Sequence, residues 1–155
     1  MINASGIGTY IKNLLPIIIK NNIKIKYYLL GNKIDLITYP FHNENNVEII
    51  DCRSDIYSIK EQIDFKKIIP REIDLYWSPH YNIPIFYRGK ILVSIMDVGH
   101  LALKSINKGL LKQSYAKFMF QKVRTKADAI LFISEFSKLE FSKYVVSPLQ
   151  PQYVT

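Results

Sequence analysis

The feature that most constrains the fold is a nearly continuous apolar run at residues 90–96, which contains Ile91, Leu92, Val93, Ile95 and Met96. A run without polar alternation is typical of a strand that is buried on both faces, as in a parallel sheet covered by helices. Strand-like and helix-like patterns alternate along the rest of the chain and are joined by short loops. The sequence therefore predicts an α/β fold with an open, mostly parallel sheet and helices on both faces.

Residue patterns place the individual elements. Strands are expected where β-branched and aromatic residues gather, at residues 23–30, 47–52, 74–77, 90–96 and 129–133. Helices are expected where apolar residues recur at intervals of three and four, at residues 7–20, 58–68, 108–126 and 134–146. Pro16 lies inside the first helical pattern and is expected to bend that helix. Ser58 and Glu61 have the spacing of a capping box, which would start the second helix.

Length and composition indicate one globular domain. The chain has 155 residues, of which 48% are apolar, and we expect a single domain at residues 1–148 followed by a tail at residues 149–155. Cys52 is the only cysteine, so no internal disulfide can form. The sequence has neither the ~20 consecutive apolar residues of a membrane span nor a signal peptide. We therefore expect a cytoplasmic protein, which can lie at the inner face of the membrane.

The net charge of +8 is unevenly distributed. Residues 98–127 contain no Asp or Glu, but they contain Lys104, Lys108, Lys112, Lys117, Lys122, Arg124 and Lys126. Such a basic patch can bind anionic lipid headgroups, phosphorylated small molecules or nucleic acid; the alternative is a solvated helix face. Nucleic acid is disfavoured, because the aromatic residues fall on apolar faces and do not alternate with the basic residues as stacking platforms would.

A glycine-bearing segment, residues 3–10, runs directly into the first helical pattern. Gly6 and Gly8 allow backbone N–H groups to face an anion at the start of a helix, where donors are unpaired and the helix dipole is positive. The alternative is an ordinary tight turn in which Ser5 or Asn3 caps the helix. In α/β proteins such a turn normally follows a strand.

Polar residues gather where expected strands end. Besides the glycine segment, these clusters lie at residues 78–82, 97–100 and 134–135. Ligands of open α/β sheets bind at the carboxyl ends of strands, so we expect the clusters to converge on one cleft. No pattern of metal ligands, Gly-x-Ser-x-Gly elbow or Walker loop is present.

Each cluster has a functional and a structural interpretation. Asp97 can accept hydrogen bonds or cap a turn, and His100 can act as a general acid or base. His80 and Tyr81 can contact a substrate or pack beneath their loop. Ser134 and Glu135 can cap a helix and occupy its first turn, a role compatible with ligand contact.

Four segments together resemble a known family. They are residues 5–15 (SGIGTYIKNLL), 74–84 (DLYWSPHYNIP), 90–97 (KILVSIMD) and 127–138 (ADAILFISEFSK). In order and spacing they resemble the amino-terminal domain of family 4 glycosyltransferases, which are retaining enzymes of GT-B fold. The resemblance spans nearly the whole chain, and the last segment is its most specific part.

The resemblance implies a fold and a set of site residues. A GT-B enzyme has two Rossmann-like domains, of which the amino-terminal one mainly holds the acceptor and the other holds the nucleotide-diphosphate sugar. By resemblance, Gly6 and Gly8 would approach the donor diphosphate or the sugar, and Met96 and Asp97 would lie beside the reacting sugar. Many relatives have His where this chain has Met96. The expected catalytic residues are Asp97 and His100, and the expected substrate-binding residues are Ser5, Gly6, Gly8, His80, Tyr81, Ser134 and Glu135.

The expected function is transfer of a sugar from a nucleotide-diphosphate sugar to a polysaccharide or glycolipid acceptor, without a covalent cofactor or a metal. The donor-binding half and the first strand are not in this sequence, so we expect a fragment, a truncated gene product or one half of a split enzyme, which is inactive alone. The alternative is a non-catalytic binding module whose basic helix docks on an anionic membrane or on a partner chain carrying the donor domain. The residues expected at such a membrane contact are Lys108, Lys112, Lys117, Lys122 and Arg124.

Overall fold

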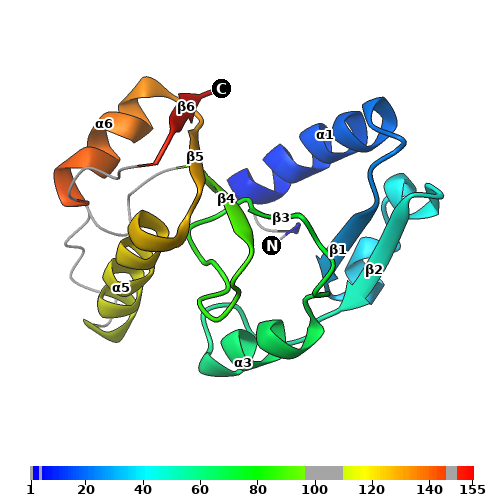
Figure 1. Cartoon of the computed structure of the whole chain (residues 1–155), viewed down its shortest axis with the longest axis horizontal. Helices are drawn as coiled ribbons and strands as arrows, with labels where there is room; N and C mark the ends of the chain where they lie inside the picture. Colours follow the sequence, from blue (N-terminus) through cyan, green and yellow to red (C-terminus); the bar gives the residue numbers. More distant parts are fainter. Residues whose placement is uncertain (1, 4, 97–109, 146–149) are drawn as a thin grey trace. The chain divides into compact units, whose positions relative to one another are not determined.

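The structure, a computed structural model, describes residues 2, 3, 5–96, 110–145 and 150–155, without the side chains of residues 5 and 110–113. The chain divides into two compact units, Met1–Asp64 and Phe65–Thr155. The two units are described separately below, and the single domain expected at residues 1–148 stays a prediction. Helices and strands alternate along most of the described chain, except that the 3-10 helix η1 follows α2 and strand β4 follows β3 (Figure 1).

The first unit contains a two-stranded parallel sheet. Its elements are α1 (Ser5–Asn21), β1 (Tyr27–Gly31), α2 (Lys33–Leu36), η1 (Pro40–Asn43), β2 (Val47–Asp51) and the beginning of α3 (Ile59–Ile68). β1 pairs with β2 from Tyr27 opposite Val47 to Gly31 opposite Asp51. β1 therefore starts later than the strand expected at residues 23–30. The preceding residues form a turn, in which the Ile25 N–H donates to the Asn22 carbonyl at 3.0 Å.

Helix α1 runs without interruption from Ser5 to Asn21, through Pro16. Leu15 and Ile19, one turn apart, are its buried side chains, with 6% and 1% of their surface exposed. Because α1 already begins at Ser5, Gly6 and Gly8 lie in its first turns. The prediction that Gly6 and Gly8 lie in a loop before the helix is therefore wrong.

Side chains accept hydrogen bonds from backbone N–H groups at the starts of α2 and α3. The Ser58 hydroxyl accepts from the Glu61 N–H at 3.0 Å, as the capping-box spacing predicts. The Glu61 carboxylate accepts from the Tyr57 N–H at 2.9 Å. At the end of β2, Asp51 accepts from the Lys33 N–H at 2.9 Å, and this bond, with Arg53 as a smaller cause, lowers the pKa of Asp51. The start of α2 is thereby tied to the end of β2.

The second unit contains a four-stranded sheet whose strands are all parallel, in the order β3-β4-β5-β6. Its elements are β3 (Leu75–Ser78), β4 (Lys90–Ile95), α5 (Leu110–Lys126), β5 (Ala129–Phe132), α6 (Glu135–Tyr144) and β6 (Gln152–Val154). The parallel α/β fold is thus confirmed, although the described strands form two sheets. Strand β6 lies where we expected only a tail. It is held to β5 by bonds from the Ile130 N–H to the Pro151 carbonyl (3.0 Å) and from the Thr155 N–H to the Phe132 carbonyl (2.9 Å).

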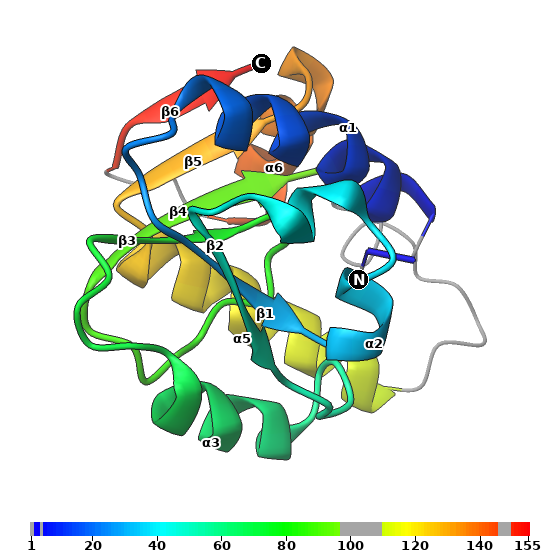
Figure 2. The same ribbon diagram turned by 90° about the vertical axis from the view of Figure 1, so that its right-hand side faces the viewer.

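Helices α5 and α6 lie on the same face of the four-stranded sheet (Figures 1 and 2). Alternate residues of β4, namely Ile91, Val93 and Ile95, are at most 1% exposed and belong to the core that these helices cover. The helices contribute Ala116, Met119, Phe120, Val123, Phe141 and the adjoining Val145. The expectation of helices on both faces is therefore not met by α5 and α6.

The opposite face of this sheet carries Trp77 and Ser94, since Trp77 pairs with Leu92 and side chains alternate along a strand. The Trp77 indole N–H donates to the Ser94 hydroxyl at 2.9 Å. Ser94 is fully buried, so this bond gives a partner to a hydroxyl that water cannot reach.

Strands β3 and β4 are parallel neighbours joined only by residues 79–89, which contain no helix. A parallel connection must cross over one face of the sheet, and here residues 79–89, the crossover segment, serve in place of a helix. Tyr81 and Ile83 of this segment are 4% and 0% exposed and belong to the core. The Tyr81 and Phe120 rings lie 4.5 Å apart, so the segment packs directly on α5.

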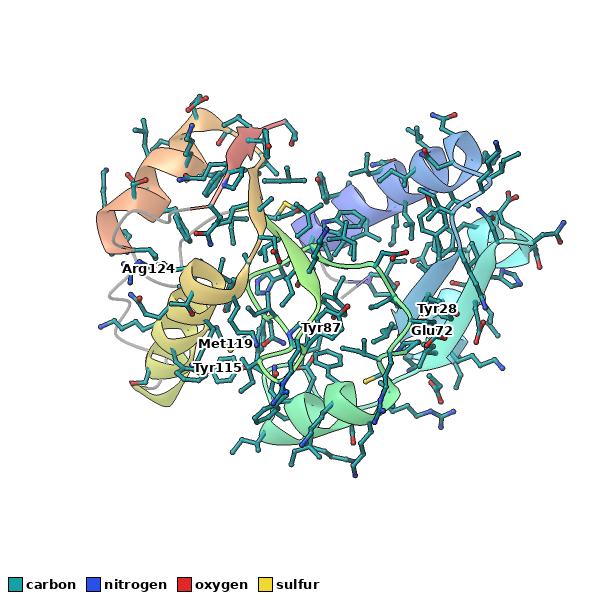
Figure 3. All side chains as sticks on the ribbon, viewed as in Figure 1. Tyr28, Glu72, Tyr87, Tyr115, Met119 and Arg124 are labelled. Carbon is teal, nitrogen blue, oxygen red and sulfur yellow. The ribbon has the colours of Figure 1, made fainter. Side chains whose placement is uncertain are left out.

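Side chains of β3 and α5 hold the crossover segment by its polar groups. The Ser78 hydroxyl donates to the His80 carbonyl at 2.7 Å, and the Tyr115 hydroxyl donates to the Asn82 side-chain oxygen at 2.6 Å. Lys126 donates to the carbonyls of Ile85 (2.7 Å) and Tyr87 (2.8 Å). Burial of Lys126, followed by the nearby Lys122 and Arg88 charges, lowers its pKa. Figure 3 labels Tyr87 on the segment and Tyr115 on α5.

We expect alanine to have opposite effects at two glycines. A Cβ atom at Gly89 would lie 2.2 Å from the Tyr87 hydroxyl oxygen, so Gly89→Ala would displace a ring that packs on Tyr76 at 5.9 Å. This change should lower the free energy of unfolding by about 1–3 kcal/mol. A Cβ atom at Gly6 would meet nothing within 4 Å. Gly6→Ala should therefore raise the free energy of unfolding by up to about 1 kcal/mol, because alanine has the higher helix propensity. Urea unfolding followed by circular dichroism measures both, and destabilisation by both would contradict the expectation.

Candidate functional site

The four strands of the second unit end at one edge of their sheet, because they are parallel. The ends are Ser78, Ile95, Phe132 and Val154. Two of the predicted clusters, residues 78–82 and 134–135, follow these strand ends. The cluster at residues 97–100, with Asp97 and His100, lies outside the described residues. We take the described part of this edge as the candidate site.

The glycine cluster belongs to the first unit. Gly6 has open space around it, and none of the described glycines has a positive φ, so its backbone conformation does not require glycine. The side chain of Ser5 is not among those described. Asn3 accepts a hydrogen bond from the Tyr39 hydroxyl at 2.8 Å, and so it contributes to tertiary packing. A role of this cluster towards phosphate or sugar stays a prediction.

Ser134 and Ser137 connect the start of α6 with the end of β4. Ser134 is the N-cap of α6, and its hydroxyl oxygen accepts from the Ser137 N–H at 3.1 Å. The two hydroxyl oxygens lie 3.0 Å apart. The Ser137 hydroxyl also donates to the carbonyl of Met96, the residue that follows β4, at 2.8 Å. The expected cap at Ser134 is therefore confirmed, and a second serine of the same motif reaches the neighbouring strand.

The direction of this hydrogen-bond chain follows from chemistry. A carbonyl oxygen can only accept, so the one hydrogen of the Ser137 hydroxyl lies on its bond to Met96. Ser134 must then donate its own hydrogen to Ser137. Ser134 thus has no hydrogen left for a ligand, but it keeps one lone pair. Towards a ligand it is an acceptor.

Glu135 occupies the first turn of α6 and is exposed. An ionised carboxylate is also an acceptor only, and its charge complements the positive end of the helix. A second anion at this helix end would be repelled by Glu135. The side chains of Ser134 and Glu135 therefore favour a ligand group that donates hydrogen bonds, such as a sugar hydroxyl.

His80 and Tyr81 follow β3 but are buried, with 6% and 4% of their surface exposed. Their rings lie 3.9 Å apart, and Tyr81 packs on Phe120. This burial agrees with the second interpretation of the cluster, packing beneath the loop. Direct contact of His80 or Tyr81 with a substrate stays a prediction.

Sequence reasoning missed three polar residues at this edge. Ser137 was part of the family-like motif but was not among the expected site residues. Tyr115 was predicted only as an apolar position of its helix, and its partner Asn82 lay in the polar cluster at residues 78–82 but was not among the expected site residues. Local spacing could have suggested Ser137, which stands three residues after the cap, as helix side chains at that position often bond back to it. No sequence signal relates Tyr115 to Asn82, 33 residues earlier.

The basic helix presents part of its charge to solvent. Lys117 is exposed, Phe118 is 47% exposed, and the Lys122 ammonium lies 5.2 Å from the centre of the Phe118 ring. Arg124 is half-buried. Lys126 is bound internally to the crossover segment. Lys108 lies outside the described residues, and the side chain of Lys112 is not described.

Among the residues that the structure describes, no three His, Cys, Asp or Glu side chains are placed to hold a metal ion. No helix among the described residues is long and apolar enough to cross a membrane.

We expect Ser134→Ala to lower the free energy of unfolding by about 1 kcal/mol, because it removes the acceptor of the Ser137 N–H. Ser142→Ala is the matched control on the same helix, since the exposed Ser142 hydroxyl donates to the Lys138 carbonyl at 3.0 Å within α6 and caps no helix end. It should change the stability by less than about 0.5 kcal/mol. Urea unfolding measures both variants, and equal losses would contradict the capping role.

No family model, no curated protein and no solved structure matches the chain. The resemblance to family 4 glycosyltransferases therefore rests on the four sequence segments alone.

Proposed function

We propose that the chain is the acceptor-side, Rossmann-like domain of a retaining glycosyltransferase of GT-B fold. The enzyme would transfer a sugar from a nucleotide-diphosphate sugar to a polysaccharide or glycolipid acceptor. Two sets of observations support this proposal. The four family-like segments supply the chemical class, and the parallel α/β architecture agrees with the fold of that class.

The observation that carries the proposal is that Ser134 and Glu135 of the candidate site act towards a ligand as hydrogen-bond acceptors. Ser134 has given its hydrogen to Ser137, and Glu135 is a carboxylate, so both offer acceptors at the carboxyl edge of the sheet. Sugar and glycolipid acceptors carry hydroxyl donors, whereas phosphate oxygens only accept. The site thus suits the acceptor, or the hydroxyls of the transferred sugar, better than the donor diphosphate.

Catalysis would depend on groups that stabilise the leaving diphosphate and the oxocarbenium-like sugar. By resemblance most of these groups belong to a donor-binding domain. Asp97 and His100 remain the proposed catalytic residues of this chain, and backbone N–H groups near Gly6 and Gly8 the proposed contacts of the diphosphate. Met96 occupies the position of a histidine in many relatives, so no histidine-assisted step is assigned there.

Weak-binding NMR tests the proposal with a small panel of probes. We expect at least one of methyl α-glucoside, methyl α-galactoside, methyl α-mannoside and N-acetylglucosamine to shift the amide signals of Ser134 and Glu135 in the chain of residues 1–155. UDP and GDP also carry ribose and base donors, but Glu135 repels their anionic diphosphate at this helix end, so they should leave those signals unchanged. Glu135→Gln, which removes the charge and one acceptor, should weaken the saccharide effect.

The matched control is Glu140→Gln on the same helix, which should leave saccharide binding unchanged. With a nucleotide sugar and these acceptors, the polypeptide of residues 1–155 should release no nucleoside diphosphate above the protein-free rate. UDP or GDP binding at Ser134, or the absence of any response to all four saccharides, would count against the proposed function.

A second candidate is a non-catalytic module that docks on an anionic membrane through α5. The observation in its favour is the group formed by the exposed Lys117 and Phe118 with the half-buried Lys122, which combines two cations with an aromatic ring that can enter the headgroup region. The inner face of the same helix, with Met119 and Phe120, is occupied by the core and is not available to lipid.

Liposome flotation tests the membrane candidate. We expect the chain to float with vesicles containing phosphatidylserine and not with phosphatidylcholine alone, because each basic residue near an anionic surface contributes about 1 kcal/mol. Lys117→Glu with Lys122→Glu should abolish flotation. The control pair Lys20→Glu with Lys24→Glu makes the same charge change in the first unit, at exposed residues, and should retain it. An equal loss of flotation in both double variants would show that net charge, and not the position of the lysines on α5, causes the binding.

A further inference from the structure

We propose that Ser137 is a positioning residue, which fixes the backbone at Met96, directly after β4. Its hydroxyl donates to the Met96 carbonyl at 2.8 Å, across 41 residues of sequence. Ser137 is 5% exposed, so its hydroxyl is removed from water and depends on protein partners. The inference rests on the proposed function in one respect: the resemblance places this strand end beside the reacting sugar.

Among the described residues, the ladder between β4 and β5 ends just before this point, at Ile95 opposite Phe132. The last described bond between β4 and the residues after β5 runs from the Ile133 N–H to the Ile95 carbonyl at 3.4 Å, which is long for a backbone hydrogen bond. The next carbonyl along the chain is that of Met96, and a side chain of α6 binds it at the shorter distance of 2.8 Å. Ser137 therefore supplies the hydrogen bond to the first carbonyl beyond the ladder between β4 and β5.

The helix that carries Ser137 is fixed by the core. Phe141 lies one turn further along α6, on the same face as Ser137, and is fully buried. Its ring packs on Phe132 of β5 at 5.4 Å and on Phe120 of α5 at 5.8 Å. Ser137 thus belongs to a helix whose distance from the sheet is set by the packing of Phe141 on its aromatic neighbours.

Ser134 completes the arrangement from the other side. It donates to the Ser137 oxygen, and a hydroxyl that accepts one hydrogen bond donates a stronger one in turn. Ser134 also accepts from the Ser137 N–H, which limits the rotation of this residue. Both contacts keep the hydroxyl of Ser137 directed at Met96.

A selective NMR experiment tests this role. Met96 and Asp97 form the only Met-Asp pair in the sequence, so carbonyl-13C methionine with 15N aspartate gives one correlation, which reports the Met96 carbonyl. Ser137→Ala should move this carbonyl resonance to lower frequency, as expected for a lost hydrogen bond. Ser137→Thr, which keeps the hydroxyl, should restore it, and Ser142→Ala should leave it unchanged. Should Ser137→Ala fail to fold, Ser137→Cys, with its weak thiol donor, should give a smaller shift in the same direction.

The possible results separate the positioning role from the proposed function. An unchanged Met96 resonance in Ser137→Ala or Ser137→Cys would overturn the positioning role, because a serine that only stabilises α6 would not affect that carbonyl. A shifted resonance supports the role whether or not saccharides bind. If saccharides bind as proposed, Ser137→Ala should weaken the binding roughly two- to tenfold, as expected for one hydrogen bond, and Ser137→Thr should recover it. A shift without any saccharide binding would leave the positioning role intact and contradict the proposed function.

Discussion

A parallel pair of strands cannot be joined without crossing one face of its sheet, and β3 and β4 make this crossing with residues 79–89 and no helix. The segment inserts Tyr81 and Ile83 into the core and leaves its carbonyls to be bound by neighbours. Lys126 binds two of them, and Tyr115 binds the Asn82 side chain. Helix α5 therefore packs against the sheet and also supplies the polar partners that a crossover helix would have supplied from its own backbone.

The predictions succeeded where a signal is local and strong. β4 and β5 follow from runs of apolar and β-branched residues, and the cap at Ser134 follows from its position between a strand and a helical pattern. They failed where tertiary context decides. β6 has only three residues and exists because β5 offers bonding partners, and Ile23 and Ile25 have strand-like side chains but stand in a turn, exposed to 74% and 52%.

The candidate site could be predicted in part for the same reason. Strand ends are visible in the sequence, so the position of Ser134 and Glu135 between β5 and α6 was predicted correctly, and their role towards a ligand stays a prediction. The bond from Ser137 to Met96 joins residues 41 positions apart, and it depends on how far α6 stands from the sheet. That distance is set by Phe141 and its aromatic neighbours, which no local pattern encodes. The role of Ser134 as a hydrogen-bond acceptor towards a ligand could not be inferred before its partners were known.

Trp77 has a practical consequence for studies of this chain. It is the only tryptophan in the sequence, it lies in β3, and its indole N–H is bound to a fully buried serine. Its fluorescence emission therefore reports on the surroundings of β3 in the second unit, whereas the far-ultraviolet signal includes the helices of both units. Comparing the two signals along one denaturation curve distinguishes a chain that loses its structure in one cooperative transition from a chain whose halves melt independently.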